Sequence, residues 1–438
     1  MVAGLAGLAV VGSAAALAFL PGSQPVGPPK PAGSTPPAGA TAAPPIPGHE
    51  VYGFVPYWEI DDTIADHLRA TNTTTVALFS VTHTGKGKIA TNQKGYRAIS
   101  GPIGRRIVAD AHDLGRRVDL TWTSLGQAKN KTLFASVALQ DRVIAALVSL
   151  RADLGVDGIA VDVEEIGSTD IAAYGAFVGR LRTALRSSDP AATVTATTGA
   201  GPQGAALALA ASVAGADRIF LMGYDYRTGS SAPGASAPIS RGDGVERSIA
   251  WSLELYAATG VPVDRTILGL PLYGLAWPTA TADMGAPNTG RGDIWVPRRN
   301  LATLLDPGVT ATYDPVEDVA FLAVPAGKAW QAIYYDTPQS LRPKLGLANS
   351  LGLAGAGFWA LGYERGLPDY TDLIADFRAG RSMTVAAADP GTGASAGPAV
   401  GASADPLAPR IGAGAAGTGG TTGNGGSDAA TNQPSVVP

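Results

Sequence analysis

The sequence predicts an α/β fold, a (β/α)8 or TIM barrel of eight parallel strands that alternate with helices. Short apolar runs alternate with longer helical ones between about residues 49 and 380, and this alternation is typical of a parallel sheet covered by helices. One continuous alternation of this length favours a single barrel over two domains. A doubly wound sheet is the second interpretation, but it calls for a glycine-rich loop after the first strand, where this chain reads FVPYWE.

The predicted strands are short, apolar segments rich in β-branched and aromatic residues. In chain order they are VYGFVPYW (51–58), TTVALFSV (74–81), RVDLTWTS (117–124), DGIAVDVE (157–164), TVTATT (193–198), RIFLMGYDY (218–226), TILGLPLYG (266–274) and GAGFWALG (355–362). Helical spacing of apolar residues lies between them, most clearly at 139–155, 170–188, 244–260 and 338–352.

One connection is too long for a plain barrel loop. Between about Trp277 and Trp330 the chain runs through NTGRGDIWVPRRN and GVTATYDPVEDVAFLAV before it reaches QAIYYD. A connection of this length inside a compact domain normally carries secondary structure of its own. We therefore expect one barrel domain over residues 49–380, with a small inserted α+β subdomain after the seventh strand at about 278–330.

The two ends of the chain differ from the middle in composition. Residues 2–20 carry no charge and fit a secretory signal peptide, with Ala16-Leu17-Ala18 as a small-x-small cleavage site. Uncleaved, the segment is long enough for an N-terminal membrane anchor. We assign 1–20 to this segment, 21–48 to a Pro/Ala/Gly-rich linker and 384–438 to a disordered Gly/Ala-rich tail. Both interpretations predict a secreted or cell-surface protein that contacts a membrane through this segment only.

Composition excludes several function classes. The chain has 32 Lys and Arg against 36 Asp and Glu, which is not the basic balance of a nucleic-acid-binding protein. It contains no cysteine, and this excludes disulfides, thiolate catalysis and Cys-based zinc sites. The histidines are scattered and never at metal-ligand spacing. We expect no metal and no cofactor.

Candidate catalytic residues lie in the segment DGIAVDVE. Ile159, Val161 and Val163 alternate at strand spacing and are expected to pack outward on helices. Asp162 and Glu164 belong to the inward row, and Glu164 reaches the C-terminal rim, where barrel enzymes place catalytic groups. Buried carboxylates are costly unless they are paired or used in chemistry. Because no predicted strand carries an inward base near its C-terminal end, we favour an active site over a structural ion pair.

Aromatic residues gather at the same ends of other predicted strands. They are Tyr57, Trp58, Trp122, Tyr224, Tyr226, Tyr273, Trp277 and Trp359. Any one of them alone is more often a core residue than a ligand platform. Their repeated placement beside carboxylates, with Asp225 between two of the tyrosines, favours stacking on sugar rings and acid-catalysed cleavage. We interpret them as residues of a polysaccharide-binding site.

These segments resemble glycoside hydrolase family 18, the chitinase-like hydrolases. DGIAVDVE is similar to the family's D-G-x-D-x-D-x-E signature, and LMGYDY is similar to its M-x-Y-D strand. ILGLPLYGLAW and GFWALG resemble its seventh and eighth strands. The resemblance covers about residues 50–380 and includes the place of the inserted subdomain.

The resemblance implies a role for each matching residue. Glu164 would be the general acid that protonates the glycosidic oxygen, and Asp162 would hold the substrate's N-acetyl group, whose own oxygen attacks the anomeric carbon. Tyr224 would donate a hydrogen bond to the same group, Asp225 would bind or polarise nearby, and Trp359 would form the floor. The implied function is retaining cleavage of β-1,4-linked N-acetylglucosamine polymers, either chitin or peptidoglycan.

One position departs from the family signature, since Ala160 stands where the family usually has its middle Asp. The alanine removes a like charge, so we expect Asp162 to stay ionised at lower pH than usual, with activity altered rather than lost. The alternative is a non-catalytic, lectin-like sugar-binding protein on the same barrel. A third interpretation, a surface adhesion module, is supported by the low-complexity ends alone. Glu165 is a less favoured acid because it has the wrong parity, and Asp157 fits the start of the strand.

Overall fold

The computed structural model describes residues 49–241 and 247–383, and in this part of the chain the predicted barrel is confirmed. Going round the closed barrel, the parallel strands are β1 (Glu50–Pro56), β2 (Thr75–Thr82), β3 (Arg117–Ser124), β4 (Gly158–Val163), β5 (Thr193–Gly199), β6 (Arg218–Met222), β7 (Thr266–Pro271) and β13 (Gly355–Trp359). The ring closes because β13 pairs with both β7 and β1. The expectations for 1–20, 21–48 and 384–438 lie outside the described residues.

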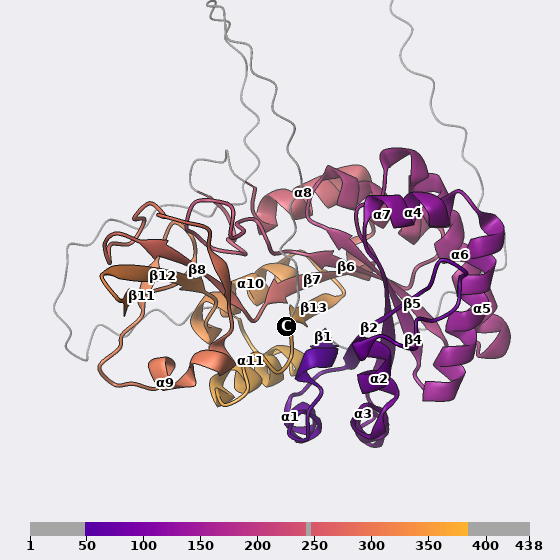
Figure 1. Cartoon of the computed structure of the whole chain (residues 1–438), viewed down its shortest axis with the longest axis horizontal. Helices are drawn as coiled ribbons and strands as arrows, with labels where there is room; N and C mark the ends of the chain where they lie inside the picture. The colour runs from indigo at the N-terminus through magenta and orange to yellow at the C-terminus, as the bar shows by residue number, and fades with distance from the viewer. Residues whose placement is uncertain (1–48, 242–246, 384–438) are drawn as a thin grey trace, which may run out of the picture. The chain divides into compact units, whose positions relative to one another are not determined.

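Helices cover the outside of the barrel (Figure 1). They are α1 (Ile64–Ala70), α2 (Lys94–Ser100), α3 (Pro102–Asp113), α4 (Gln127–Phe134), α5 (Val137–Leu154), α6 (Ile171–Ser188), α7 (Pro202–Val213), α8 (Ile249–Thr259), α10 (Pro338–Ser350) and α11 (Pro368–Arg378). Local sequence explains several of their ends. Pro202 and Pro338 occupy first turns, where a missing N–H costs nothing, and Gly155 ends α5 in the left-handed conformation.

Each barrel strand turns one face to the helices and the other to the barrel interior. On β4, Ile159, Val161 and Val163 are buried in the large core between strands and helices, as predicted. The inward faces of several strands meet in a smaller apolar cluster inside the barrel, made of Tyr52, Phe54, Ala77, Ala160, Phe220 and Ile267. The predicted inward and outward rows of β4 are therefore confirmed.

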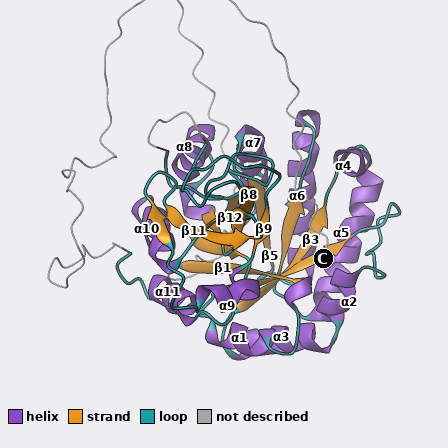
Figure 2. Cartoon of the chain, turned by 60° about the vertical axis from the view of Figure 1, so that its left-hand side comes forward, coloured by secondary structure: helices purple, strands orange, loops and turns teal. Residues whose placement is uncertain are grey.

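A second sheet is inserted after β7 (Figure 2). Its antiparallel strands lie in the order β10 (Thr312–Asp314), β11 (Val319–Ala326), β12 (Ala329–Tyr335), β8 (Gly274–Thr279) and β9 (Asp293–Trp295), and α9 (Leu301–Leu304) accompanies them. The predicted subdomain thus exists, but it begins at residue 274 and ends at 335 instead of spanning 278–330. The boundaries differ because β8 and β12 pair with each other instead of joining the barrel.

Buried ion pairs connect the insertion to the rim of the barrel. Arg298 of the insertion and Arg365 both donate to Glu59, which is 2% exposed and follows β1. On another side, Arg241 donates to Glu317 of the insertion at 2.9 Å. Removing one partner would leave a buried charge unpaired, so these contacts fix the subdomain beside the mouth of the barrel.

Among the described residues, no single helix is long and apolar enough to cross a membrane. α4 and α5 meet that test only when they are taken together, and the chain bends by 100° between them.

Candidate active site

Asp162 lies inside the C-terminal mouth of the barrel. In register, Thr123 of β3 and Thr197 of β5 lie on either side of it, and the Thr197 hydroxyl donates to Asp162 Oδ1. Asp162 is 4% exposed. Burial raises its pKa to about 6, although the hydrogen bond from Thr197 acts in the opposite direction. The expectation that Ala160 lets Asp162 ionise at lower pH than in relatives with an aspartate at this position compares this chain with those relatives, and it stays a prediction.

Glu164 follows the last residue of β4 and is half-buried. The N–H of Glu164 donates to the carbonyl oxygen of Ser124 at 3.2 Å. Asn130 Nδ2 donates to the carbonyl oxygen of Glu164. The Ser124 hydroxyl in turn donates to Asn130 Oδ1 at 2.6 Å. Ser124 ends β3 and Asn130 lies in α4, so two elements fix the backbone from which this carboxylate projects. A backbone fixed in this way holds the carboxyl group in a defined position, which suits a proton donor.

The backbone adopts an unusual conformation directly after each candidate segment. Glu165 has a φ of 60° and Asp225 a φ of 62°, in the left-handed region that residues other than glycine rarely adopt. Such strained positions cluster at functional sites. Glu165 is exposed, and its Oε2 accepts from the backbone N of Gln127 at 3.3 Å. Glu165 therefore lies on the rim, and Glu164 remains the candidate acid.

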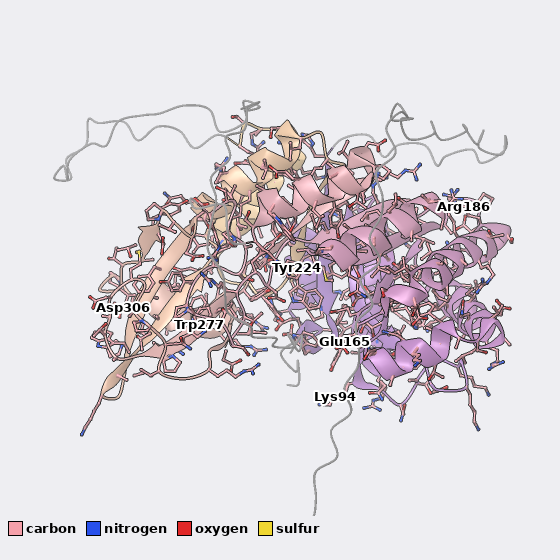
Figure 3. All side chains as sticks on the ribbon, turned by 90° about the horizontal axis from the view of Figure 1, so that it is seen from above. Lys94, Glu165, Arg186, Tyr224, Trp277 and Asp306 are labelled. Carbon is pink, nitrogen blue, oxygen red and sulfur yellow. The ribbon has the colours of Figure 1, made fainter. Side chains whose placement is uncertain are left out.

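Tyr224 lies among the carboxylates of the mouth. Its pKa is raised by burial and then by the negative charges of Asp225, Asp162 and Glu164, so its hydroxyl is within electrostatic range of all three. Figure 3 shows Tyr224 near the middle of the molecule, between the inserted sheet and the barrel helices. The three predicted catalytic residues, Asp162, Glu164 and Tyr224, therefore come together at one end of the barrel.

An aromatic cluster forms a floor beside these polar groups. The Trp359 ring lies edge-on to Phe79, with centroids 4.6 Å apart, and 5.7 Å from Phe54. Trp58 contacts the rings of both Phe79 (6.1 Å) and Trp359 (6.3 Å). Trp359, Phe79 and Trp58 are half-buried, so part of each ring remains open to a ligand. Phe79 is absent from the predicted binding residues, although its inward parity near the end of the second strand is a signal that could find it.

Three aromatic residues predicted to bind substrate do not reach this floor. Trp122 is fully buried on the outward side of β3, where its ring lies 5.1 Å from Phe177 of α6. Trp277 is fully buried in β8 of the inserted sheet. Tyr226 turns toward α8, where its hydroxyl shares a hydrogen bond with Ser252 (2.6 Å). The predictions for Trp122 and Trp277 are wrong, because outward parity and the insertion bury these rings elsewhere. Contact of a glycan with the half-buried Tyr226 stays a prediction.

The remaining predicted binding residues lie at the mouth. Tyr57 is half-buried, and its ring lies 4.9 Å from that of Trp58. Tyr273 is buried, lies 6.2 Å from the Tyr224 ring and donates its hydroxyl to Asp225 Oδ1. Tyr273 thus orders Asp225. Direct contact of a glycan with Tyr57 and Asp225 stays a prediction.

A second buried carboxylate lies deeper in the barrel. Asp119 of β3 is 1% exposed, and its Oδ2 accepts from Tyr52 OH (2.8 Å) and Thr195 Oγ1 (3.1 Å). Burial raises its pKa to about 6. In register it lies beside Gly158, one inward step below Ala160, and only a glycine fits there because an added Cβ would collide with Asp119. Asp119 is absent from the predicted site residues, since the segment RVDLTWTS contains no motif that marks it.

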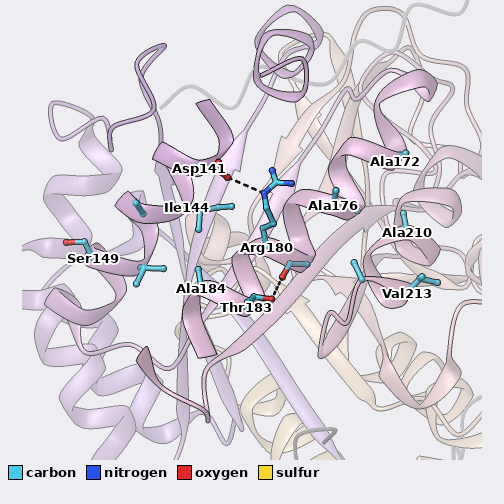
Figure 4. Close-up of a pocket in the computed structure, with 15 residues that line it drawn as sticks. Asp141, Ile144, Ser149, Ala172, Ala176, Arg180, Thr183, Ala184, Ala210 and Val213 are labelled. Carbon is cyan, nitrogen blue, oxygen red and sulfur yellow. Dashed lines mark hydrogen bonds and ion pairs between the residues drawn. The ribbon is translucent and has the colours of Figure 1, made fainter. Parts of the chain in front are cut away.

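Away from the mouth, the described residues form a large hollow and no metal-binding cluster. A hollow of about 1130 Å³ lies outside the barrel between α5, α6 and α7 (Figure 4). Its lining is mostly apolar, and Asp141 pairs with Arg180 there at 3.2 Å. In the same described ranges, no group of three or more His, Asp or Glu side chains is arranged to hold a metal ion. The mouth of the barrel is therefore the candidate active site.

Comparison with a protein family supports this assignment. The sequence model of "Glycosyl hydrolases family 18" matches residues 51–364. This span contains most of β1, the other barrel strands and the whole insertion. The match therefore extends over both the carboxylates of β4 and the aromatic floor.

Curated relatives match over shorter stretches. "Nod factor hydrolase protein 1" of Medicago truncatula is 30% identical over 156 residues, which are 34% of this chain and 39% of that protein. The chain spans about two fifths of the length of the curated relatives it matches.

Solved structures share the fold over a larger part of the chain. A class V chitinase from Nicotiana tobaccum aligns with a TM-score of 0.64 at 16% identity, covering 75% of this chain and 99% of that one. The spore cortex-lytic enzyme SleL from Bacillus cereus aligns with a TM-score of 0.62 at 18% identity, covering 75% and 74%. At these identities the likeness shows the fold alone.

Proposed function

The chain belongs to glycosyl hydrolases family 18, and from this premise we propose that it is an exported hydrolase of glycans that contain β-1,4-linked N-acetylglucosamine. One observation carries the proposal. Asp162 of β4 and Glu164, which directly follows β4, lie within electrostatic range of Tyr224. Tyr224 contacts the same interior cluster as Trp359 and Phe79. Carboxylates beside open aromatic faces suit a site that binds a sugar ring and transfers a proton to it.

In the proposed first step, Glu164 acts as the general acid. It gives its proton to the glycosidic oxygen while the carbonyl oxygen of the substrate's own acetamido group attacks the anomeric carbon. The glycosidic bond breaks, the leaving sugar departs as an alcohol, and a positively charged oxazolinium ring forms on the sugar that remains. Asp162 accepts a hydrogen bond from the acetamido N–H and stabilises this positive charge, while the Tyr224 hydroxyl donates to the same group.

In the proposed second step, the Glu164 carboxylate becomes the general base. It takes a proton from a water molecule as the water oxygen attacks the anomeric carbon from the side that the leaving sugar vacated. The bond between the anomeric carbon and the acetamido oxygen then breaks, so the acetamido group is restored. Two displacements at one carbon give net retention of configuration. The proton returns to Glu164, and the site is ready for another cycle.

Two substrate classes fit this chemistry, chitin and peptidoglycan, because both contain β-1,4-linked N-acetylglucosamine. The names of structural neighbours support each of them. The Nicotiana tobaccum neighbour is a chitinase and the Bacillus cereus neighbour is a spore cortex-lytic enzyme. The half-buried rings of Trp359, Phe79 and Trp58 would bind the sugar face in either polymer.

Hydrolysis by the full chain and by two matched variants tests the proposal. Glu164→Gln removes the proton donor and is expected to lower kcat/KM on chitooligosaccharides and peptidoglycan by at least about a thousandfold. Glu165→Gln changes the adjacent, exposed carboxylate and is expected to leave kcat/KM within about twofold, because this group lies on the rim. Cleavage that survives Glu164→Gln would contradict the assignment of the acid. The anomer released, followed by NMR, is expected to be the β-anomer.

Ala160 is the observation that favours a second candidate function. It lies between the two buried carboxylates, where the family signature has an Asp, and is itself fully buried. A lectin-like protein on this barrel would bind N-acetylglucosamine polymers through the same aromatic floor without cleaving them. Binding without hydrolysis by the unaltered chain, on chitin and on peptidoglycan alike, would favour this second function over the first.

Export is part of the proposal and is supported by composition alone. Residues 2–20 are uncharged and apolar, as expected of a signal peptide or an N-terminal anchor. Deleting them is expected to retain the protein inside the cells of its native host, and cell fractionation would measure this. Equal distribution of the deleted and complete chains would contradict export through this segment.

A further inference from the structure

A polar group lies on the rim of the barrel on the β2 and β3 side of the mouth. It consists of Ser80 and Thr82 at the end of β2, Thr123 at the end of β3, and Lys129 of α4, and is called the Lys129 group below. Lys129 Nζ donates to Thr82 Oγ1 (2.7 Å), and Thr82 Oγ1 donates to the carbonyl oxygen of Thr123 (2.8 Å). Ser80 Oγ and Thr123 Oγ1 share a hydrogen bond (3.3 Å). The group is therefore held in place before any ligand binds.

Lys129 carries a charge that has no anionic counterpart among residues 49–241 and 247–383. Its contact there is the neutral Thr82 hydroxyl. Lys129 is half-buried, and burial lowers its pKa. His83 lies close by, and burial followed by the Lys129 charge lowers its pKa to about 4, so its ring is neutral at pH 7. A half-buried charge without a counter-ion costs free energy, and an anion on a ligand would recover that cost.

The strand register places the Lys129 group close to the candidate catalytic residues. Thr82 pairs with Thr123, and Thr123 pairs with Asp162. Because neighbouring strands lie about 4.8 Å apart, Thr82 is about 10 Å from Asp162 across the mouth. α4, the helix that carries Lys129, also supplies Asn130, which donates to the carbonyl oxygen of Glu164. A glycan bound at Asp162 and Glu164 would therefore bring its substituents near the ammonium group.

We propose that the Lys129 group is a subsite for a carboxylate carried by the glycan, and that it directs the enzyme toward strands containing N-acetylmuramic acid over neutral chitin. The inference rests on the proposed glycan hydrolysis and adds its substrate class. Muramic acid carries a lactyl ether whose carboxylate is either free or extended by an acidic peptide. The Lys129 ammonium pairs with this carboxylate, and the Thr82 hydroxyl, which accepts from Lys129 and donates to the carbonyl oxygen of Thr123, holds the ammonium group in place. Chitin has no anionic substituent and gains nothing from these contacts.

Binding of defined tetrasaccharides to the full chain carrying Glu164→Gln tests the subsite, since this variant lacks the proposed acid and would not consume the ligands. One probe is the N-acetylglucosamine tetramer. The others alternate N-acetylglucosamine with N-acetylmuramic acid and carry free lactyl carboxylates, amidated lactyl groups, or L-alanyl-D-isoglutamine stems. We expect a carboxylated probe to bind about tenfold more tightly than the amidated one. Adding Lys129→Gln is expected to abolish that difference and to change binding of the neutral tetramer by less than about twofold.

Two control variants separate the charge of Lys129 from its structural contacts. Lys131→Gln changes an exposed lysine of the same helix and is expected to leave every affinity unchanged. Lys129→Arg keeps the charge and is expected to keep the preference. Equal weakening of all probes by Lys129→Gln, or equal binding of the amidated and carboxylated probes, would overturn the proposal. The carboxylated probe that loses most affinity identifies the free lactyl group or the peptide stem as the partner.

Failure of the proposed function would give a different result. A wild-type chain that binds carboxylated probes through Lys129 but cleaves none of them would contradict the acid role of Glu164 and support the subsite. A wild-type chain that cleaves the neutral tetramer and binds carboxylated probes no better than amidated ones would support hydrolysis and overturn the subsite. A chain that binds none of the probes would overturn both.

Discussion

Two buried aspartates on neighbouring strands have the same raised pKa in different surroundings. Asp119 lies in the deep layer of the barrel interior and Asp162 lies at the rim, and burial raises the pKa of each to about 6. Asp119 is enclosed by donors from Tyr52 and Thr195, whereas Asp162 lies within electrostatic range of Tyr224. A raised pKa therefore reports burial, and the position at the C-terminal strand end distinguishes the candidate catalytic group from the structural one.

Replacing each aspartate by asparagine is expected to give the largest difference in kcat/KM between the rim and the deep layer of the barrel. Asp162→Asn keeps the size of the side chain and removes the charge proposed to hold the acetamido N–H, so we expect kcat/KM on the N-acetylglucosamine tetramer to fall about a thousandfold. Asp119→Asn leaves the mouth intact and is expected to lower kcat/KM by less than about threefold. Comparable losses in both variants would show that the deep layer controls the reacting groups. Thermal unfolding at pH 5 checks that both variants fold.

The free energy of unfolding should depend on pH because both buried aspartates have a raised pKa. A carboxyl whose pKa is raised from 3.8 to about 6 in the folded state stabilises the fold below pH 4, and that contribution is lost as the pH rises through 6. At 1.36 kcal/mol per pKa unit, Asp119 accounts for a loss of about 3 kcal/mol between pH 4 and pH 7.5. Asp119→Asn removes this loss, so the stability of the variant relative to wild type is expected to rise by about 3 kcal/mol over that interval.

Urea unfolding of the wild type and the Asp119→Asn variant at pH 4 and pH 7.5 measures this shift. Asp162 titrates in both proteins, so its own contribution cancels in the comparison. Parallel changes in the unfolding free energies of the two proteins would show that Asp119 does not carry the pH dependence. The asparagine can keep the hydrogen bonds from Tyr52 and Thr195, because both donate to the same carboxylate oxygen.

The sequence predicts the rim far better than the deep layer, for a physical reason. The alternation in DGIAVDVE fixes which face of β4 is buried against helices, so the inward side of Asp162 and Glu164 follows from the sequence. Asp119 is also on an inward face, but its segment carries no signature and its donors, Tyr52 and Thr195, lie 67 and 76 residues away in the chain. Contacts of this range depend on barrel closure, which local patterns do not encode.

The wrong aromatic predictions have the same origin. Trp122 lies near the end of a true strand, but outward parity places its ring against Phe177 of α6. Trp277 belongs to β8, which begins three residues after the end of β7, and no turn signal in the sequence separates the two strands. The pairing of β8 with β12 decides where the barrel ends and the insertion begins. That pairing is between segments far apart in the sequence.

Ala160 lies between the two carboxylate layers. It is fully buried among aromatic side chains on the inward face of β4. Thr121 of β3 lies beside it in register. Within the described ranges, Thr121 Oγ1 and Asp119 Oδ1 are buried without a hydrogen-bond partner. An aspartate at position 160 would therefore meet the Thr121 hydroxyl as a donor and would place a third carboxylate next to Asp162.

Ala160→Asp is expected to have the smallest of these effects, on the pH profile and not on the maximal rate. A neighbouring negative charge disfavours ionisation, so it raises the pKa of Asp162 above its present value of about 6. Because the proposed reaction needs ionised Asp162, the acid limb of kcat/KM should move up by about one pH unit, or about 1.4 kcal/mol. Hydrolysis rates from pH 4 to pH 8 measure the limb, and Ala160→Asn, which adds the same volume without the charge, should leave it in place. If Ala160→Asp also left it in place, the group that titrates in the acid limb could not be Asp162, and the rim would owe its pH dependence to another carboxylate.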